Sequence, residues 1–364
     1  MKPCTSFVAV LAMFCLVFLV PAAVAASPAS AAAKVDMDLH QHPTAGKTPV
    51  EVSVGLYVTN LVAIDETRET FEVGGYLIGV WQDSRLALPA DARSEQTGSS
   101  TASVATPRTF RVEDIWTPPI EAANSISHKT NSYLLEADRT GKVTYVERFD
   151  AVLSNDYALR KFPFDTQILR FEFQPFLSAA SGIQFAAQAL PSTGISPEQH
   201  TELAAWRIKN LKYTTEKVAG NSFVPATREA LFQIVIERRS GFYLWKVFLP
   251  LLILTMIPVL VFWIDVKEFD WILKVPMTML LSMVAFEFTV ARELPRIGYV
   301  TFLDAVFLAS FAFCFFCIIE ITTVFLMQKA GMRAPAVKLH TAGKWAYPLA
   351  YFVILLLLAA CFMA

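Results

Sequence analysis

Two hydrophobic patterns divide the chain near Arg239. From residue 49 to residue 239, short segments of alternating apolar and polar positions are separated by turn residues, as in "VEVSVGLYVTNLVAI", "TFEVGGYLIGVW", "TYVERFDAVL", "TQILRFEFQPF", "WRIKNLKYTTEKV" and "LFQIVIERR". Strands of this length at this spacing predict a β-sandwich. Beyond Arg239 long apolar runs replace the alternation. The predicted fold is therefore a β-sandwich domain over 34–239 followed by a four-helix transmembrane bundle over 240–364.

The second half contains four candidate membrane spans. Residues 247–264 and 345–364 carry no charged side chain, and each run is long enough to cross a hydrocarbon core of about 30 Å. Residues 271–290 and 300–328 are also mostly apolar. They contain four ionisable groups that cannot face lipid cheaply, Lys274, Glu287, Asp304 and Glu320. We predict helices at about 242–264, 271–292, 300–328 and 345–364.

Both ends of the sequence bear on orientation. Residues 1–26 combine Lys2, an apolar run from 7 to 20 and small residues in "PAAVAAS", which is typical of a secretory signal peptide. The stretch "QKAGMRAPAVKLHTAGK", interpreted as a loop before the last span, has four basic residues and no acid, which indicates the cytoplasmic side. The β-domain and the C-terminus are then extracytoplasmic, in a multi-pass protein of the cell inner (plasma) membrane.

Composition narrows the class of protein further. The chain is 54% hydrophobic and 17% charged, with a mean hydropathy of +0.44, which is typical of a membrane protein. Its net charge of −1, without a basic cluster, argues against nucleic acid. Residues 30–313 contain no cysteine, so the sandwich is predicted to fold without a disulfide. Cys314 and Cys317 are interpreted as buried small side chains, and no metal or other cofactor is expected. Residues 91–108 are predicted to form a surface loop.

The second span has a polar stripe. Its members recur at intervals of three and four residues, which puts them on one helical face: Asp270, Lys274, Thr278, Leu281, Ala285, Phe288 and Arg292. Several copies of this face around an axis would enclose a water-filled path with an apolar constriction. The alternative is a non-conducting bundle in which neighbouring helices pair with the polar groups. Asp270 and Lys274 are spaced to pair with each other, and Pro276 is expected to loosen the cytoplasmic end of the helix.

Four motifs suggest a family. "RKFPFD", "WTPPIEAAN", "YLIGVWQDSRL" and "LPRIGYVTFLDA", taken with the fold, resemble the bacterial pentameric ligand-gated ion channels of the Cys-loop receptor superfamily. The resemblance covers nearly the whole mature chain. Two departures stand out. Residues 150–165 contain no cysteine, so the disulfide of the animal receptors is missing, and Ala123 stands where many relatives have an aromatic residue.

The resemblance implies a homopentamer whose sandwich is coupled to its membrane helices. The Phe-Pro-Phe tip of the family packs on the outer ends of these helices, near Leu294, Pro295 and Arg296 in this sequence. Asp165 is expected to pair with Arg238 beside Glu66. The implied coupling interface comprises Glu66, Phe162, Pro163, Phe164, Asp165, Arg238 and Pro295. The alternative is a static structural joint.

The resemblance also implies an agonist site between subunits, formed by Tyr76, Glu121, Phe176 and Phe223. Aromatic rings and one carboxylate suit a small amine, although each residue could equally serve ordinary packing, and protons are the main rival agonist. Asp270 favours permeant cations, whereas an unneutralised ring of Lys274 would favour anions. No nucleophile–base motif or phosphate loop supports an enzyme, and a membrane-anchored receptor without a pore is the other alternative. The expected partners are further copies of the chain, the lipid bilayer, an agonist and permeant ions.

Overall fold

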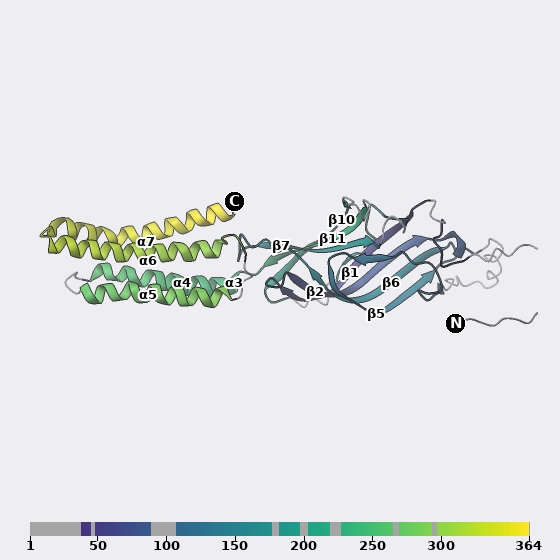
Figure 1. Ribbon diagram of the computed structural model, residues 1–364, viewed down its shortest axis with the longest axis horizontal. Helices are drawn as coiled ribbons and strands as arrows, with labels where there is room; N and C mark the ends of the chain where they lie inside the picture. The colour runs from purple at the N-terminus through teal and green to yellow at the C-terminus, as the bar shows by residue number, and fades with distance from the viewer. Residues whose placement is uncertain are drawn as a thin grey trace, which may run out of the picture. The chain divides into compact units, whose positions relative to one another are not determined.

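The structure of the chain is a computed structural model that describes residues 38–44, 48–88, 107–176, 182–196, 203–218, 227–264, 269–292 and 297–363. The predicted signal peptide at 1–26 lies outside these residues. The predicted surface loop at 91–108 does so as well, except for its last two positions. Figure 1 shows the two parts that the sequence predicts, a β-sandwich and a set of long helices.

Within the described residues the strands form two sheets. The first has the order β3-β5-β6-β2-β1-β8, with β9 also paired to β1, and the second has the order β10-β11-β7-β4. Their bounds are β1 Val50–Asp65, β2 Thr70–Gln82, β3 Arg108–Thr109, β4 Ile120–Ala122, β5 Ser125–Ala137, β6 Lys142–Ser154, β7 Thr166–Pro175, β8 Ile183–Phe185, β9 Gly194–Ile195, β10 Trp206–Val218 and β11 Thr227–Arg238. Alternate residues of both sheets fill the core, including Val54, Leu56, Phe71, Phe171 and Phe232.

One long strand does not follow the predicted alternation. β5 is exposed along most of its length and becomes buried only at Leu135 and Ala137. Its outer neighbour β3 covers only Ala137 and Glu136 in register, so β5 is largely an edge strand. An edge strand with both faces in solvent needs no apolar period, so its sequence has no alternating pattern.

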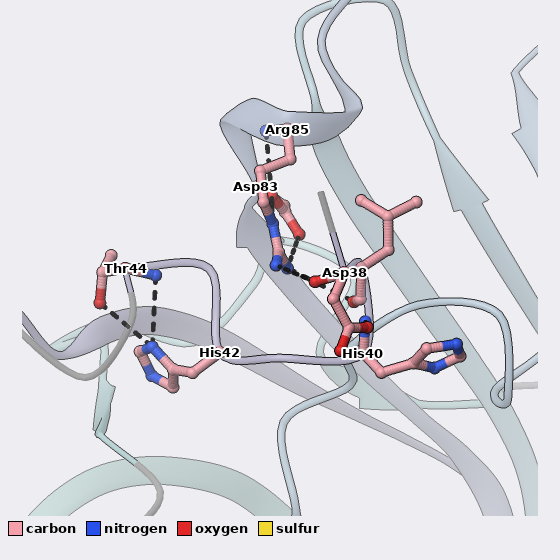
Figure 2. A network of polar contacts seen from close by, with 7 residues as sticks. Asp38, His40, His42, Thr44, Asp83 and Arg85 are labelled. Atoms are coloured by element: carbon pink, nitrogen blue, oxygen red, sulfur yellow. Dashed lines mark hydrogen bonds and ion pairs between the residues drawn. The ribbon is translucent and has the colours of Figure 1, made fainter. Parts of the chain in front are cut away.

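The W-x-D-x-R-L motif holds the N-terminal segment onto the sandwich. The Arg85 guanidinium donates to the buried Asp83 carboxylate at 2.7 Å and to the backbone oxygen of Asp38 at 3.1 Å, as Figure 2 shows. Asp83 also accepts from the Arg85 amide and so begins the short helix η1, Ser84–Leu86. Beside this network the ring of His42 packs edge-on against Trp116, with centroids 4.9 Å apart. The motif therefore has a structural role in this chain, because it satisfies backbone carbonyls that the segment leaves open.

Among the described residues, four helices are long and apolar enough to cross a membrane. The first span, Gly241–Trp263, comprises α3 (Gly241–Tyr243), the π-helical η2 (Leu244–Phe248), α4 (Leu249–Met256) and the 3₁₀ segment η3 (Ile257–Trp263). Pro250 and Pro258 lack the N–H that a regular α-helix needs, and the irregular turns adjoin them. The other spans are α5 (Phe269–Ala291), α6 (Phe302–Lys329) and α7 (Arg333–Met363).

The prediction of a long loop before the last span is wrong. Only residues 330–332 interrupt the helices there, with Gly331 at a φ of +83°, and α7 begins at Arg333. Pro335 lies in the first turn of α7, where a missing N–H is tolerated, and the charges that follow do not end a helix. At 31 residues α7 is about 46 Å long, so its basic first turns extend beyond a hydrocarbon core of about 30 Å.

Two polar groups in the spans have structural explanations. Asp304 forms a capping box with Thr301, because the Asp304 amide donates to the Thr301 hydroxyl and the Thr301 amide donates to the Asp304 carboxylate. Asp304 therefore marks the start of α6. Cys314 and Cys317 are fully buried, as predicted for small apolar side chains.

Candidate pore face, membrane joint and ligand face

The predicted stripe forms one continuous exposed face of α5, and its last member, Arg292, directly follows the helix. All seven residues of the stripe are exposed in the single chain, and Leu281 and Phe288 retain 71% and 67% of their full accessibility. The buried positions Ile272, Pro276 and Met283 lie on the opposite side of the helix and pack toward the other spans. α5 is therefore packed against the rest of the chain by one face and presents the stripe away from it.

The hydroxyl groups along α5 bond to the helix itself. Thr278 donates to the Lys274 carbonyl at 2.8 Å, and Ser282 donates to the Thr278 carbonyl at 2.9 Å. Such bonds to the preceding turn satisfy the hydroxyl without a partner on another helix. This observation weighs against the alternative in which neighbouring helices of one chain pair with the polar stripe.

The proposed pair at the cytoplasmic end is not formed within one chain. Among the described residues, no ion pair joins Asp270 to Lys274, and both side chains are exposed. The i,i+4 spacing places the two groups on one face, but two flexible exposed side chains gain little from a contact in water. Within one chain, Asp270 therefore does not neutralise the charge of Lys274.

Arg238 is the centre of a buried charge cluster at the end of the sandwich. Its guanidinium lies 2.8 Å from Asp165 and 2.8 Å from Glu66, and the side chains of Arg238 and Asp165 are 3% and 1% exposed. The same group lies 4.1 Å from the ring centroid of Trp206 and 4.7 Å from that of Phe162. Two carboxylates and two aromatic faces thus replace the water that Arg238 loses.

Phe162 and Phe164 connect this cluster to the membrane helices. Phe162 packs edge-on against Tyr243 of α3, with centroids 4.8 Å apart. Phe164 lies 6.1 Å from Phe248 of η2 and 5.9 Å from Phe302 at the start of α6. The expected contact with Leu294, Pro295 and Arg296 falls outside the described residues and stays a prediction.

The same loop makes three further hydrogen bonds to the membrane part of the chain, two through its backbone and one through the Lys161 side chain. The Phe302 amide donates to the Arg160 carbonyl at 2.9 Å, and the Tyr299 hydroxyl accepts from the Leu159 amide at 3.0 Å. The Lys161 ammonium donates to the Met363 carbonyl at the end of α7, where a cation also suits the helix dipole. The motif thus contacts the first, third and fourth spans.

Two of the four predicted ligand residues lie close together on the four-stranded sheet. Glu121 of β4 is opposite Gln174 of β7 and accepts a hydrogen bond from its amide at 2.8 Å. Phe176 follows β7, is exposed and donates its amide to the Pro119 carbonyl next to β4. Tyr76 lies on β2 in the other sheet, where it is opposite Tyr57 of β1. Phe223 lies outside the described residues.

The prediction of ligand residues from the sequence did not include three further carboxylates near Glu121. Glu216 and Glu229 are directly opposite each other across the β10–β11 hairpin, and Glu172 lies on the adjacent strand β7. Burial raises the pKa of Glu229, and the negative charges of Glu172 and Glu216 raise it further. Opposed like charges destabilise a strand pair, and a cation bound on this face would relieve their repulsion. The strand registers supply this signal, which no short motif contains.

A second polar cluster lies inside the sandwich. Glu147 accepts hydrogen bonds from His128 at 2.8 Å and from Thr130, and it lines a cavity of about 160 Å³ together with Trp81. Burial alone would raise the pKa of Glu147, but the hydrogen bonds from His128, Thr130 and Tyr145 lower it. His128 is partly exposed, so protons from the medium can reach this pair.

A β-sandwich joined through buried contacts to four membrane-spanning helices, one of which presents an unpaired face, defines the class of membrane receptors with an external binding domain. The neurotransmitter-gated ion-channel ligand binding domain matches this chain over residues 35–240, and the chain belongs to this family. The family consists of ligand-gated ion channels and not of enzymes. The protein is accordingly a multi-pass membrane protein with an extracellular ligand-binding domain.

Relatives from bacteria and animals align with most of the length of this chain. The proton-gated ion channel of Gloeobacter violaceus is 24% identical over 322 residues, which cover 88% of this chain and 85% of that channel. The human glycine receptor subunit beta is 27% identical over 325 residues, covering 85% of this chain and 61% of the receptor subunit. The human gamma-aminobutyric acid receptor subunit rho-1 is 23% identical over 294 residues, covering 79% and 59%. The chain thus spans about three-fifths of the length of these animal subunits.

Proposed function

We propose that the chain is the subunit of a homopentameric ligand-gated ion channel in a bacterial inner membrane, with the pore lined by α5. The observation that carries this proposal is the exposure of all seven residues of the polar stripe on a helix that packs by its opposite face. Charged and hydroxyl side chains cannot face lipid at this density, so other copies of the same helix are the partners that fit. Five copies place the apolar residues Leu281 and Phe288 around one axis.

The agonist that fits best is a small organic amine bound between subunits. Glu121, Glu172, Glu216 and Glu229 concentrate negative charge on one face of the four-stranded sheet, and Phe176 adds an exposed ring. Ammonium groups bind to such combinations through charge-assisted hydrogen bonds and cation–π contact. Tyr76 and Phe223 would complete the site from a neighbouring subunit and from the hairpin loop, respectively.

Proton gating is the second candidate. It is favoured by the His128–Glu147 pair, whose imidazole is partly exposed to the outer medium, and one relative is described as a proton-gated channel. Either agonist would act through the cluster at Arg238, which lies at the membrane end of the sandwich and contacts the first span through Tyr243. We further propose that cations permeate, with Lys274 as the residue that limits their passage.

The purified protein is expected to be a pentamer that conducts. Native mass measurement in mild detergent should give about five chains, since one α5 helix per subunit cannot enclose a path. In a planar bilayer at constant pH, n-butylamine added to the sandwich side should elicit current. Butan-1-ol, which has the same length but no charge, should not.

The same bilayer experiment separates the alternatives. Current elicited by acidification of the sandwich side, with no response to n-butylamine, would replace the amine by protons as the agonist. A pentamer that conducts under neither condition would support the receptor without a pore. A monomer or dimer that conducts would refute the proposed assembly.

Leu281→Ser is expected to favour the open state. A hydroxyl at the apolar constriction lowers the cost of wetting the pore, so resting current should rise and less agonist should be needed. Leu308→Ser, at an exposed leucine of α6, is the matched control and should leave both quantities unchanged. If the Leu281 variant behaves like the parent, Leu281 does not form the barrier.

A further inference from the structure

A buried acid–imidazole pair links three membrane segments at the end of the bundle that lies away from the sandwich joint. Glu320 of α6 and His340 of α7 are only 7% and 8% exposed. The His340 Nδ1 atom lies 3.5 Å from the Glu320 Oε1 atom, and its Nε2 atom lies 3.4 Å from the backbone oxygen of Ile264. Ile264 directly follows η3, so the imidazole stands between α6, α7 and the end of the first span.

Both neighbours of the imidazole are acceptors. Among the described residues, neither carboxylate oxygen of Glu320 has a hydrogen-bond donor, and the Nδ1 atom of His340 has no hydrogen-bond partner. Neutral imidazole has one N–H and can donate a hydrogen bond either to the carboxylate or to the Ile264 carbonyl. Imidazolium has two N–H groups and can donate to both. A buried carboxylate without a donor is costly. Only the state of the pair that holds an additional proton therefore gives both acceptors a donor at the same time.

The other titratable groups around the pair do not supply this donor. Cys317, one turn before Glu320 on α6, and Tyr347 of α7 interact with Glu320. The Tyr347 hydroxyl already donates to the Phe316 carbonyl at 2.9 Å. η3 contributes no titratable side chain, and α5 turns Ile272 toward this region while Asp270 and Lys274 face outward.

We propose that Glu320 and His340 form a proton-binding site that works as a clamp. With one additional proton, His340 donates through Nδ1 to Glu320 and through Nε2 to Ile264, and it ties the three segments together. When the proton leaves to water, one of the two contacts loses its donor and the segments separate more easily. No covalent bond changes in either direction.

The position of the clamp suggests what it controls. α5 begins at Phe269, only five residues after Ile264, so the clamp holds the end of the first span at a point close in sequence to the start of the proposed pore helix. The pair is about 14 Å from the end of α6 and about 10 Å from the start of α7, which are joined by residues 330–332. The pH on that side of the membrane would set the occupancy of the site. This inference depends on the fold and not on the agonist or the conductance.

Hydrogen–deuterium exchange of the pentamer or of whatever assembly the chain forms tests the clamp without any ligand. After correction for the intrinsic rate, protection of the amides of residues 336–344 in the parent should fall by about tenfold between pH 6 and pH 9. Peptides from 350–363 of the same helix should show no such step, since they lie beyond the pair.

Variants locate the effect. Glu320→Gln gives His340 an amide donor that no proton exchange removes, so the pH step over residues 336–344 should disappear while protection persists. His340→Gln should also remove the step, and His40→Gln, an exposed histidine outside the spans, should retain it. The proposal is overturned if the parent shows no pH step or if Glu320→Gln shows the same step as the parent. Because the parent and Glu320→Gln decide the question, a His340 variant that fails to fold does not prevent the test.

Discussion

Arg238→Gln is expected to lower the free energy of unfolding of the protein by about 3–5 kcal/mol, because it leaves the carboxylates of Asp165 and Glu66 beside each other without their counter-charge. The guanidinium contacts with Trp206 and Phe162 are lost in the same step. Asp165→Asn should cost less, since Arg238 keeps Glu66. Denaturant or thermal unfolding in one detergent measures the difference between the variants.

A surface ion pair on the adjacent turn supplies the control. Arg68 and Asp65 lie 3.6 Å apart with side chains 82% and 42% exposed, so Arg68→Gln should cost less than about 1 kcal/mol. Similar losses for Arg68→Gln and Arg238→Gln would show that burial of the Arg238 cluster contributes nothing.

Gating distinguishes coupling from a static joint. If the cluster couples the two domains, Asp165→Asn and Arg238→Gln should each shift the agonist response, and the double variant should differ from the sum of the single effects. Additive shifts would mean that the two residues do not interact during gating. Loss of stability with an unchanged agonist response in folded protein would establish the static joint.

The joint shows what a motif can reveal that periodicity cannot. Asp165 and Arg238 are separated by 73 positions, and nothing in the local pattern of either segment brings them together. Their pairing was predicted from the resemblance of "RKFPFD" to a family motif, and the structure places the two side chains in contact. The roles assigned to them in gating stay predictions.

Local patterns worked where one face of an element is buried. The alternation in β1, β2 and β7 reflects a core on one side, and the stripe on α5 reflects a helix packed by one face. β5 was missed because an exposed edge strand has no such period. The start of α7 was missed because basic residues were interpreted as a loop, although they merely extend a helix out of the membrane.

Contacts between strands or helices that are distant in the sequence could not be predicted from local patterns. Glu216 and Glu229 become a pair only when the hairpin register is fixed, and Glu320 meets His340 only when α6 packs on α7. In both cases the sequence shows ordinary charged or titratable positions. The structure turns them into sites by removing water and placing like or complementary groups within reach.

Lys274→Gln is expected to move the reversal potential in a salt gradient toward the cation limit, which is about 59 mV for a tenfold gradient. Five ammonium groups around one axis are the strongest charge feature of the proposed pore, and like charges act strongly in a narrow conduit. Among the described residues of one chain, Asp270 forms no ion pair with Lys274. The ring of Lys274 ammonium groups therefore keeps its charge unless a neighbouring subunit neutralises it. Removing the ring should favour cations in both cases.

The parent channel then tells the two cases apart. If the ammonium ring stays unpaired, the parent should pass anions or conduct cations poorly, and the shift on Lys274→Gln should be large. If Asp270 of an adjacent subunit pairs with it, the parent should already prefer cations, and the shift should be small with a rise in conductance. Lys338→Gln removes an equal charge from the exposed start of α7 and should change neither quantity. Identical permeability ratios and conductance in the parent and in Lys274→Gln would place Lys274 outside the pore and would remove the main support for α5 as its lining.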